Sequence, residues 1–305
     1  MIFNLNNQGA AELRRMTGNY YAGNDFSAIE MDIEDATDEL IQVIGRAVYD
    51  KAENAYLKGD GNDQVRLVQL VQRPIALLAT LHYFQRNDVS HEDSGRKVKL
   101  SSDGTDKIPW EWQLDRDDSI HLQAYYSAVE RLIRWLNESK DADWQKSDAY
   151  RNAAGLLIRS GREFDSYFPI SQSERMYILL LPFLREVQIA TVAPSYGEGF
   201  DKLLDATSDV RYAASKALAL LTMSVALRRM PLQLIPYSVV QGFNAANGMA
   251  DSQPASLADT QRMAAMLEAD AADWLERMRQ LRDGTSGEDI PLLPSNSKTN
   301  KYFRV

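Results

Sequence analysis

The chain has 305 residues and no cysteine, which excludes disulfide bonds, thiolate zinc sites and cysteine nucleophiles. Its 43 acidic residues outnumber its 34 Lys and Arg residues, for a formal net charge of −9. That charge disfavours a protein that neutralises phosphates, so we expect no sequence-specific nucleic acid partner. The N-terminus lacks a basic segment followed by a long apolar one, and no stretch reaches the ~20 apolar residues of a membrane span. We therefore expect a soluble protein made for the cytoplasm, with no membrane partner.

The first part of the chain carries apolar residues at helical spacing. Residues 28–58 predict an amphipathic helical region with a break near Gly45, and their acids gather at the front, where the helix dipole favours negative charge. Residues 65–83 predict a buried helix that Pro74 should kink or divide. The acidic, glycine-rich segment at 59–63 lacks the alternating ligands of a calcium loop, so we interpret it as a turn.

Residues 96–114 change period and predict a small β-hairpin insertion. Apolar and polar residues alternate in 97–100 and in 108–114, on either side of a Ser-Asp-Gly turn. Trp110 and Trp112 would share one face of this ribbon. Because a two-stranded ribbon is marginal by itself, the tryptophans would pack either on the helices or on another chain. Both alternatives stay open, and the second makes them partner-binding residues.

Helical spacing resumes after the hairpin. The expected helices are at 121–138, at 149–167, from a cap at Ser171 through Val187, at 209–230, and from Ser256 to Gly284. Residues 209–230 have no charge between Ala217 and Leu227 and many small side chains, which predicts the central helix of an all-α domain. The last helix has an apolar, methionine-rich stripe, a pattern more typical of core than of a groove. It consists of Met263, Met266, Leu267, Ala271, Trp274, Met278 and Leu281.

The two halves of the chain repeat one order of features. Each has a Phe, an apolar helix, a Tyr followed by Asp-Lys, a turn, a buried helix, an insertion and a helix with Trp-Leu, at 135–136 and at 274–275. We therefore predict a mainly α fold with two related helical modules that arose by internal duplication. The first module is 1–147 with the hairpin insertion, the second is 148–284, and an extended tail follows at 285–305.

The familiar catalytic motifs are absent from the sequence. It contains no phosphate-binding loop, dinucleotide fingerprint, zincin motif or nucleophile elbow. Acidic clusters at 32–35 and 115–118 do not alternate onto one buried face, so they are typical of solvated surface. His82 follows an apolar helix face, where a structural histidine is more typical than a ligand. We expect no enzyme activity, no cofactor and no metal site.

Several segments resemble an uncharacterised family of prophage-encoded proteins of similar length. They are A-E-L near the N-terminus, W-E-W-Q-L-D at 110–115, F-D-S-Y-F-P-I-S-Q-S-E-R-M at 164–176 and A-P-S-Y-G at 193–197. The helical module itself is similar to phage head-to-tail connector proteins, the helical adaptors below the portal. The resemblance implies a virion protein, assembled in the host bacterial cytoplasm, that forms a homo-oligomeric ring with portal and tail or neck proteins as partners. Two modules in one chain depart from single-module adaptors, which leaves the subunit count open.

A second hypothesis belongs to another class. The chain would then be a cytoplasmic helical protein that holds a small ligand or a partner between its two modules. A concave pocket with convergent polar groups would favour this hypothesis, whereas a flat surface and an extended tail would favour the ring.

The C-terminal segment 295–305, SNSKTNKYFRV, differs in charge from the rest of the chain, because it contains cations and aromatic rings but no acid. A fraying terminus is one interpretation. The other is an extended arm that docks on an acidic neighbour, with the rings as anchors and the cations as steering charges. In that interpretation the partner-binding residues are Lys298, Lys301, Tyr302, Phe303 and Arg304.

Overall fold

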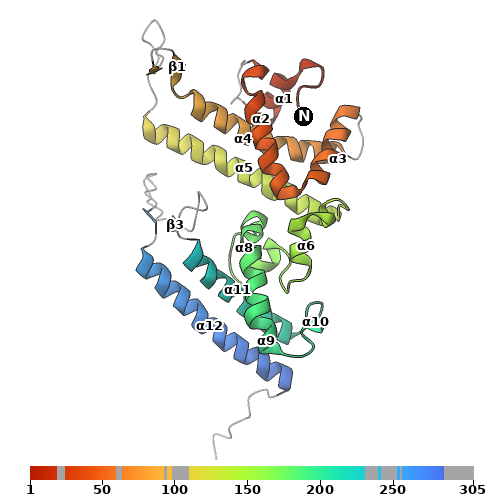
Figure 1. Cartoon of the computed structure of the whole chain (residues 1–305), viewed down its shortest axis with the longest axis vertical. Coiled ribbons are helices and arrows are strands. Elements are labelled where there is room, and N and C mark those ends of the chain that lie inside the picture. Colours follow the sequence, from red (N-terminus) through yellow and green to blue (C-terminus); the bar gives the residue numbers. More distant parts are fainter. Residues whose placement is uncertain are drawn as a thin grey trace, which may run out of the picture. The chain divides into compact units, whose positions relative to one another are not determined.

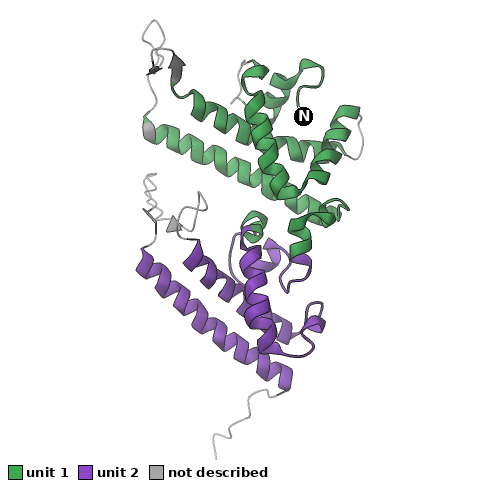
Figure 2. Cartoon of the chain, in the orientation of Figure 1, with its two compact units in different colours: residues 1–152, 173–178 green, residues 153–172, 179–305 purple. Residues whose placement is uncertain are grey.

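The computed structural model forms two compact units (Figure 2). Unit 1 comprises residues 1–152 and 173–178, and unit 2 comprises residues 153–172 and 179–305. The structure describes all residues except 19–24, 60–63, 93–94, 98–109, 231–239, 242–252, 255 and 285–305. The mainly α fold is confirmed. The expected single boundary at 147/148 does not describe this division, because a short later segment returns to unit 1.

The elements of unit 1 are helical apart from one pair of short strands (Figure 1). In chain order they are η1 (Leu5–Asn7), α1 (Gly9–Thr17), η3 (Phe26–Ala28), α2 (Glu30–Ile44), α3 (Arg46–Lys58), α4 (Val65–Asn87), β1 (Ser90–Glu92), β2 (Gly95–Lys97), α5 (Glu111–Ser139), η4 (Trp144–Lys146) and α6 (Asp148–Ala154), whose end crosses into unit 2.

Helix α4 is the centre of unit 1, because α1, α2, α3 and α5 all pack against it. Every residue from Pro74 to Leu81 is buried. The helix continues through Pro74 instead of dividing there. The Asp32 carboxylate on α2 accepts two hydrogen bonds from the Arg86 guanidinium on α4, of 2.9 and 2.7 Å, which fixes α2 on α4.

The predicted break at Gly45 is confirmed. Gly45 has φ +85° and ends α2 one residue before α3 begins. A side chain at this backbone conformation would be strained, so glycine is the residue that suits the corner. Ile44 and Val48 on either side are fully buried.

The predicted hairpin at 96–114 is not supported. The strand pair of this region is β1 with β2, antiparallel, with Ser90 opposite Lys97. Residues 98–109 lie outside the described residues, and residues 111–114 are the first turn of α5. The Trp110 N–H donates to Gln113 Oε1 at 3.0 Å, and the Gln113 N–H donates to the Trp110 carbonyl at 2.8 Å. These bonds close a helical turn, which outweighs a short alternation of apolar residues.

Unit 2 is also helical apart from one pair of very short strands (Figure 1). Its elements are α7 (Gly161–Asp165), α8 (Glu174–Val187), whose first turn belongs to unit 1, the π-helical turn η5 (Gln188–Val192), α9 (Ala193–Tyr196), α10 (Phe200–Leu203), α11 (Asp209–Arg229), β3 (Val240–Gln241), antiparallel β4 (Gln253–Pro254) and α12 (Leu257–Asp283).

The expected continuous helix at 149–167 is wrong, because residues 155–160 separate α6 from α7. Gln188 on η5 explains the interruption. Its amide accepts a hydrogen bond from the Leu157 N–H at 2.8 Å and donates one to the Gly155 carbonyl at 2.9 Å. These backbone groups therefore bond to a distant side chain rather than to a continuing helix.

The predicted cap of α8 at Ser171 is also wrong. Ser171 has φ +57°, and the residue that accepts the Met176 N–H is Ser173, at 3.0 Å. Ser173 thus caps α8, and a second capping group comes from α5. The Glu130 carboxylate accepts hydrogen bonds from the Ser173 hydroxyl and from the backbone N–H groups of Glu174 and Arg175, at 2.6 to 2.9 Å. This long-range cap explains why residues 173–178 belong to unit 1.

Helix α11 is the buried helix that the sequence predicts. Ser208 caps it, accepting the Arg211 N–H at 3.2 Å, and Ala213, Ala217 and Leu218 are fully buried. Small residues let α12 pack closely against it. The Ser224 hydroxyl donates to the Ala264 carbonyl on α12 at 3.0 Å.

Helix α12 begins and ends where the sequence predicts. Ser256 accepts the Asp259 N–H at 3.1 Å, and Gly284 follows the helix with φ +70°. The core interpretation of the methionine stripe is wrong for Met263 and Met266, which are 51 % and 57 % exposed, and right for Met278. The buried stripe shares Leu267, Ala271 and Met278 with the predicted one and adds Ala264 and Leu275.

Both units share one order of elements, a long helix, a short strand pair and a second long helix. In unit 1 these are α4, β1 with β2, and α5, and in unit 2 they are α11, β3 with β4, and α12. Leu136 and Leu275, which occupy matching positions in the proposed repeat, are both buried. This order agrees with an internal duplication, which stays a prediction.

Two stretches are long and apolar enough to cross a membrane, judged by length and composition alone. They are Glu174–Tyr196 and Asp209–Arg229. The expectation that no such stretch exists was wrong by this criterion, because the many Leu, Ile, Val and Ala residues outweigh the hydroxyl and charged residues among them. Core helices pass the same test, and 61 % of the most apolar part of α11 is buried inside the protein. The two stretches are therefore weak evidence for a membrane span.

Candidate interaction surface

Trp110 and Trp112 lie at the start of α5 with their side chains in solvent. Trp110 is the residue before the helix and Trp112 is in its first turn, and they are 71 % and 59 % exposed. The alternative in which both rings pack in the core is therefore excluded. Large exposed aromatic side chains are typical of protein interfaces, so a partner contact stays the prediction for this pair.

An exposed isoleucine extends the apolar area along α5. Ile120 is 51 % exposed and lies about two helical turns after Trp112. We call Trp110, Trp112 and Ile120 the tryptophan surface. Ile120 was not predicted from the sequence, because residues 108–114 were expected in a strand and the following helix only from 121.

The opposite side of α5 is fixed to α4. His121 is 2 % exposed, and its Nε2–H donates to the Leu77 carbonyl at 2.8 Å, which defines the tautomer. Burial lowers the pKa of His121, and the bond to Leu77 and the nearby Asp117 and Asp118 oppose that shift only in part. The histidine thus has a structural role. It holds the helix that presents the tryptophan surface.

The predicted tail residues Lys298, Lys301, Tyr302, Phe303 and Arg304 lie outside the described residues. Their role as a docking arm stays a prediction from the sequence.

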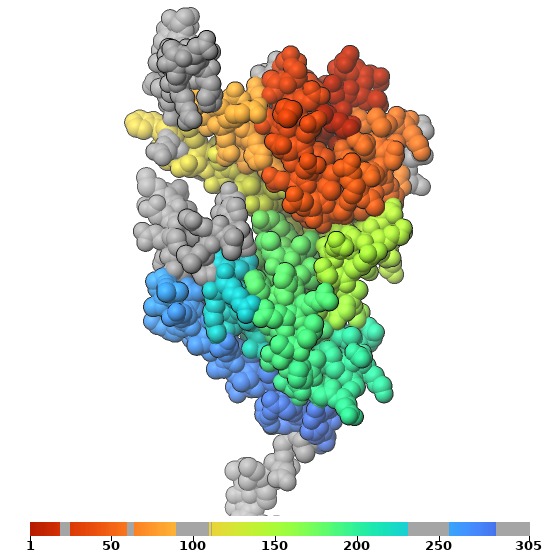
Figure 3. Space-filling model, in the orientation of Figure 1, coloured from red at the N-terminus to blue at the C-terminus, as the bar shows by residue number. Residues whose placement is uncertain are grey.

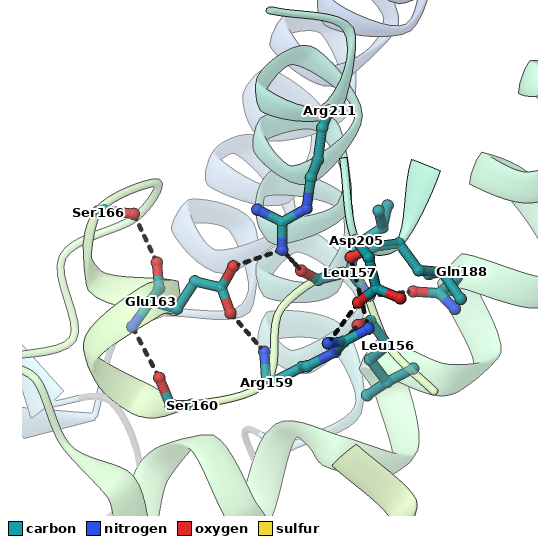
Figure 4. A network of polar contacts seen from close by, with 10 residues as sticks. Leu156, Leu157, Arg159, Ser160, Glu163, Ser166, Gln188, Asp205 and Arg211 are labelled. Carbon is teal, nitrogen blue, oxygen red and sulfur yellow. Dashed lines mark hydrogen bonds and ion pairs between the residues drawn. The ribbon is translucent and has the colours of Figure 1, made fainter. Parts of the chain in front are cut away.

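A network of charged side chains in unit 2 needs a separate assessment as a site (Figure 4). The Glu163 carboxylate accepts hydrogen bonds from the Arg211 guanidinium and from the Arg159 N–H, both at 2.8 Å. Arg211 also donates to the Leu157 carbonyl at 2.7 Å. The Arg159 guanidinium pairs with Asp205 at 2.8 Å.

Most partners in this network are backbone groups of the segment between α6 and α7. Ser160 carries the hydroxyl group closest in sequence to the Glu163 carboxylate. This hydroxyl accepts a hydrogen bond from the Glu163 N–H at 3.1 Å and caps α7. The Glu163 carboxylate is bound by Arg159 and Arg211, and the Ser160 hydroxyl is used as a helix cap. These groups therefore hold residues 155–160 in place and do not form an activated nucleophile. We therefore assign the network a structural role, which the sequence analysis missed because its members are distant in the chain.

Metal binding finds no support in the part of the chain that the structure describes. No group of three or more His, Asp or Glu side chains there could hold an ion. Asp32 and Asp141, the buried aspartates, have cationic partners instead. The Asp141 carboxylate pairs with the Lys51 ammonium at 2.5 Å, and Asp32 pairs with Arg86.

The comparison with protein families gives one match. The model of a family of unknown function (DUF6712) matches residues 40–154 and 193–286. The matched residues make up more than half of the chain and include the tryptophan surface and both long helix pairs. No curated protein and no solved structure matches the chain.

Proposed function

The chain belongs to a family of unknown function (DUF6712), and from that premise we propose that it is a structural phage protein, a head-to-tail connector that forms a ring between portal and tail. Its partners are other copies of itself, the portal protein and tail or neck proteins. It is assembled in the host bacterial cytoplasm and ends in the virion. The resemblance of its helical modules to connector proteins supports this proposal.

The observation that carries the proposal is the tryptophan surface. Two exposed tryptophans lie at the start of a helix whose other side is anchored by a buried histidine. Such a surface offers apolar area to a partner without a large loss of conformational freedom on binding. An assembly protein requires this property, whereas an isolated monomer gains nothing from exposed tryptophan rings.

The proposed mechanism is mechanical and involves no turnover. Each pairwise contact is weak, but closure of a ring engages every subunit twice, so modest interfaces add up to a durable assembly. The C-terminal arm 295–305 contributes a further contact to an acidic neighbour.

The test is the mass of the purified full chain in solution, alone and mixed with a portal protein, by size-exclusion chromatography with light scattering. We expect a closed oligomer, or a defined complex with the portal ring. A chain that remains monomeric in both samples contradicts the proposal. So does a hydrolase or transferase activity that one carboxylate substitution abolishes.

A further inference from the structure

Unit 1 contains a cleft with a rim of arginines that the proposed function does not yet use. Arg15 on α1, Arg66 and Arg73 on α4 and Arg131 on α5 line a cleft of about 260 Å³. The other lining residues are Gln69, Met16 and Leu70, and no acid among the described residues lines the cleft. We call this feature the arginine cleft.

Packing of the helices explains why these arginines meet. Arg66, Gln69 and Arg73 follow one another at steps of three and four residues, so they form the exposed stripe of a largely buried α4. Met16 and Leu70 are 7 % and 4 % exposed and form an apolar floor between the arginines.

The four guanidinium groups have no acidic partner in the part of the chain that the structure describes. Among the described residues, none of the four arginines makes an ion pair or a side-chain hydrogen bond. Four like charges around one cleft repel each other, so an anion that enters the cleft gains from all of them. The guanidinium fork suits a carboxylate or a phosphate equally well.

The same unit exposes the opposite charge on α2. This helix has no Lys or Arg, and five of its acids are exposed and unpaired among the described residues, namely Glu30, Glu34, Asp35, Asp38 and Glu39. Met31 lies among them and is 63 % exposed. The atoms of α2, orange-red in Figure 3, are on the surface of unit 1 that faces the viewer. We call these six residues the acidic ridge.

We propose that the acidic ridge of one copy of this chain docks into the arginine cleft of the next copy. The ridge brings five carboxylates around an apolar tip, Met31, and the cleft offers four guanidinium groups around an apolar floor, so charge and polarity match. The two faces differ, hence the contact is head-to-tail, the kind that closes into a ring. The inference rests on the ring of the proposed function and names its interface.

Nucleic acid is the competing occupant of the cleft. The whole chain has a net charge of −9, and the acidic ridge belongs to the same unit as the cleft, so phosphates are repelled on approach. Two copies, each with a net charge of −9, also repel one another at a distance, and the pairing of the cleft arginines with the ridge carboxylates offsets that repulsion at the contact.

The experiment reverses the charge of each face in the full chain. The cleft variant is Arg66→Glu with Arg73→Glu, and the ridge variant is Glu34→Lys with Asp38→Lys. Each variant alone opposes like charges across the contact, and we expect self-association to weaken by roughly 100-fold or more. In an equimolar mixture every contact between unlike variants has opposite charges, so we expect association of the two variants to return in alternating assemblies. Sedimentation velocity at low and high salt measures both effects.

A matched control is Arg151→Glu with Arg277→Glu, which changes the net charge equally at two exposed arginines outside the cleft. It should assemble like the wild type. Because the substituted side chains are exposed, circular dichroism should show native helix content in all variants. If the cleft variant fails to fold, Arg66→Gln with Arg73→Gln replaces it, with a smaller loss expected.

Each other outcome has a definite meaning. If the wild type forms rings that neither variant weakens, or the mixture fails to assemble, the inference is wrong and the ring of the proposed function stands. If the wild type is monomeric alone but joins a portal ring, the inferred interface is wrong and the connector function stands. If the wild type neither self-assembles nor joins a portal ring, the inferred interface and the connector function are both wrong. If the cleft variant assembles normally but loses binding to a double-stranded DNA probe that the wild type binds, the cleft is a nucleic acid site instead.

Discussion

Individual side chains in this protein connect helices that are distant in the sequence, and His121 is one of them. Its ring is buried between α5 and α4 and donates to a backbone carbonyl of α4. Burial favours the neutral imidazole, so the pKa of His121 in the folded protein lies below its ordinary value near 6.5. The charge state of one residue is thereby coupled to the packing of the helix that carries the tryptophan surface.

The first prediction concerns pH. Because the pKa of His121 is lower in the folded than in the unfolded protein, His121 of the unfolded chain takes up its proton first as the pH falls below about 6.5. Protonation therefore favours the unfolded chain, and unit 1 loses stability as the pH falls. We expect the midpoint of thermal unfolding of the wild type to fall more between about pH 7 and about pH 5 than that of His121→Gln, which retains an N–H donor for Leu77. Parallel pH profiles of the two proteins would contradict the prediction.

The second prediction concerns Arg211 in unit 2. Its loss removes the side-chain donor of the Leu157 carbonyl and leaves the Glu163 carboxylate with the Arg159 N–H but without its guanidinium partner, in partly buried surroundings. Arg211→Ala should lower the free energy of unfolding by about 1–3 kcal/mol in a urea titration. Arg277→Ala, at an exposed arginine of α12, is the control and should change it by less than about 0.5 kcal/mol. Equal effects of the two substitutions would show that the network does not hold unit 2.

At the scale of elements, each unit is organised around one helix, α4 in unit 1 and α11 in unit 2. The two differ in how they accommodate neighbours. Helix α11 uses small residues that let α12 pack closely, whereas α4 buries larger residues such as Leu77, Leu78 and Leu81 and leaves the stripe of the arginine cleft exposed. In unit 1, exposed charge and apolar area for contacts thus lie on α2, α4 and α5.

The third prediction tests the start of α5. Changing Trp110 and Trp112 to Ala should weaken assembly, because truncation of an aromatic anchor at an interface commonly costs ~2 kcal/mol or more. The melting temperature of the monomer should stay close to that of the wild type, since both rings are exposed. Light scattering and differential scanning calorimetry measure the two effects.

Trp144 provides the matched control for this pair. It is 3 % exposed, and its indole N–H donates to the Asn137 side-chain oxygen at 2.7 Å. Trp144→Ala should destabilise the monomer by about 3–5 kcal/mol. If the exposed pair destabilises the monomer as much as Trp144→Ala does, the tryptophan surface has a folding role instead of a role in assembly.

At the scale of the whole molecule, the family match extends over parts of both units. It starts within α2 and resumes at α9, so it includes the long helix pair of each unit. The repeated order of elements and the shared family model both favour a chain that works as one two-module subunit.

The fourth prediction concerns the C-terminal segment. Deletion of residues 295–305 should leave the melting temperature unchanged and should weaken ring formation or portal binding, because we propose that the deleted cations and rings dock on an acidic neighbour. A variant in which Lys298, Lys301 and Arg304 become Gln separates the charge from the aromatic anchors. Normal assembly of the truncated protein would show that the segment is merely a terminus.

Local chemistry allowed the sequence by itself to determine much of this fold. Helical spacing predicted α2, α3, α4 and α11, Gly45 marked the corner between α2 and α3, and Ser256 and Gly284 marked the limits of α12. Each of these features depends on residues within a few positions of one another, through side-chain spacing, a cap or a backbone conformation that suits glycine. The exposed tryptophans were also singled out from the sequence, although in the wrong secondary structure.

Contacts between distant residues decided the rest. The cap of α8 comes from Glu130 on α5, and the break before α7 depends on Gln188. The arginine cleft likewise requires α1, α4 and α5 to meet, since its members are separated by many residues in the chain. Periodicity within one helix cannot report such partners, because it shows that a face is polar but not which other helix lies beside it. The tertiary structure alone brought these charges together.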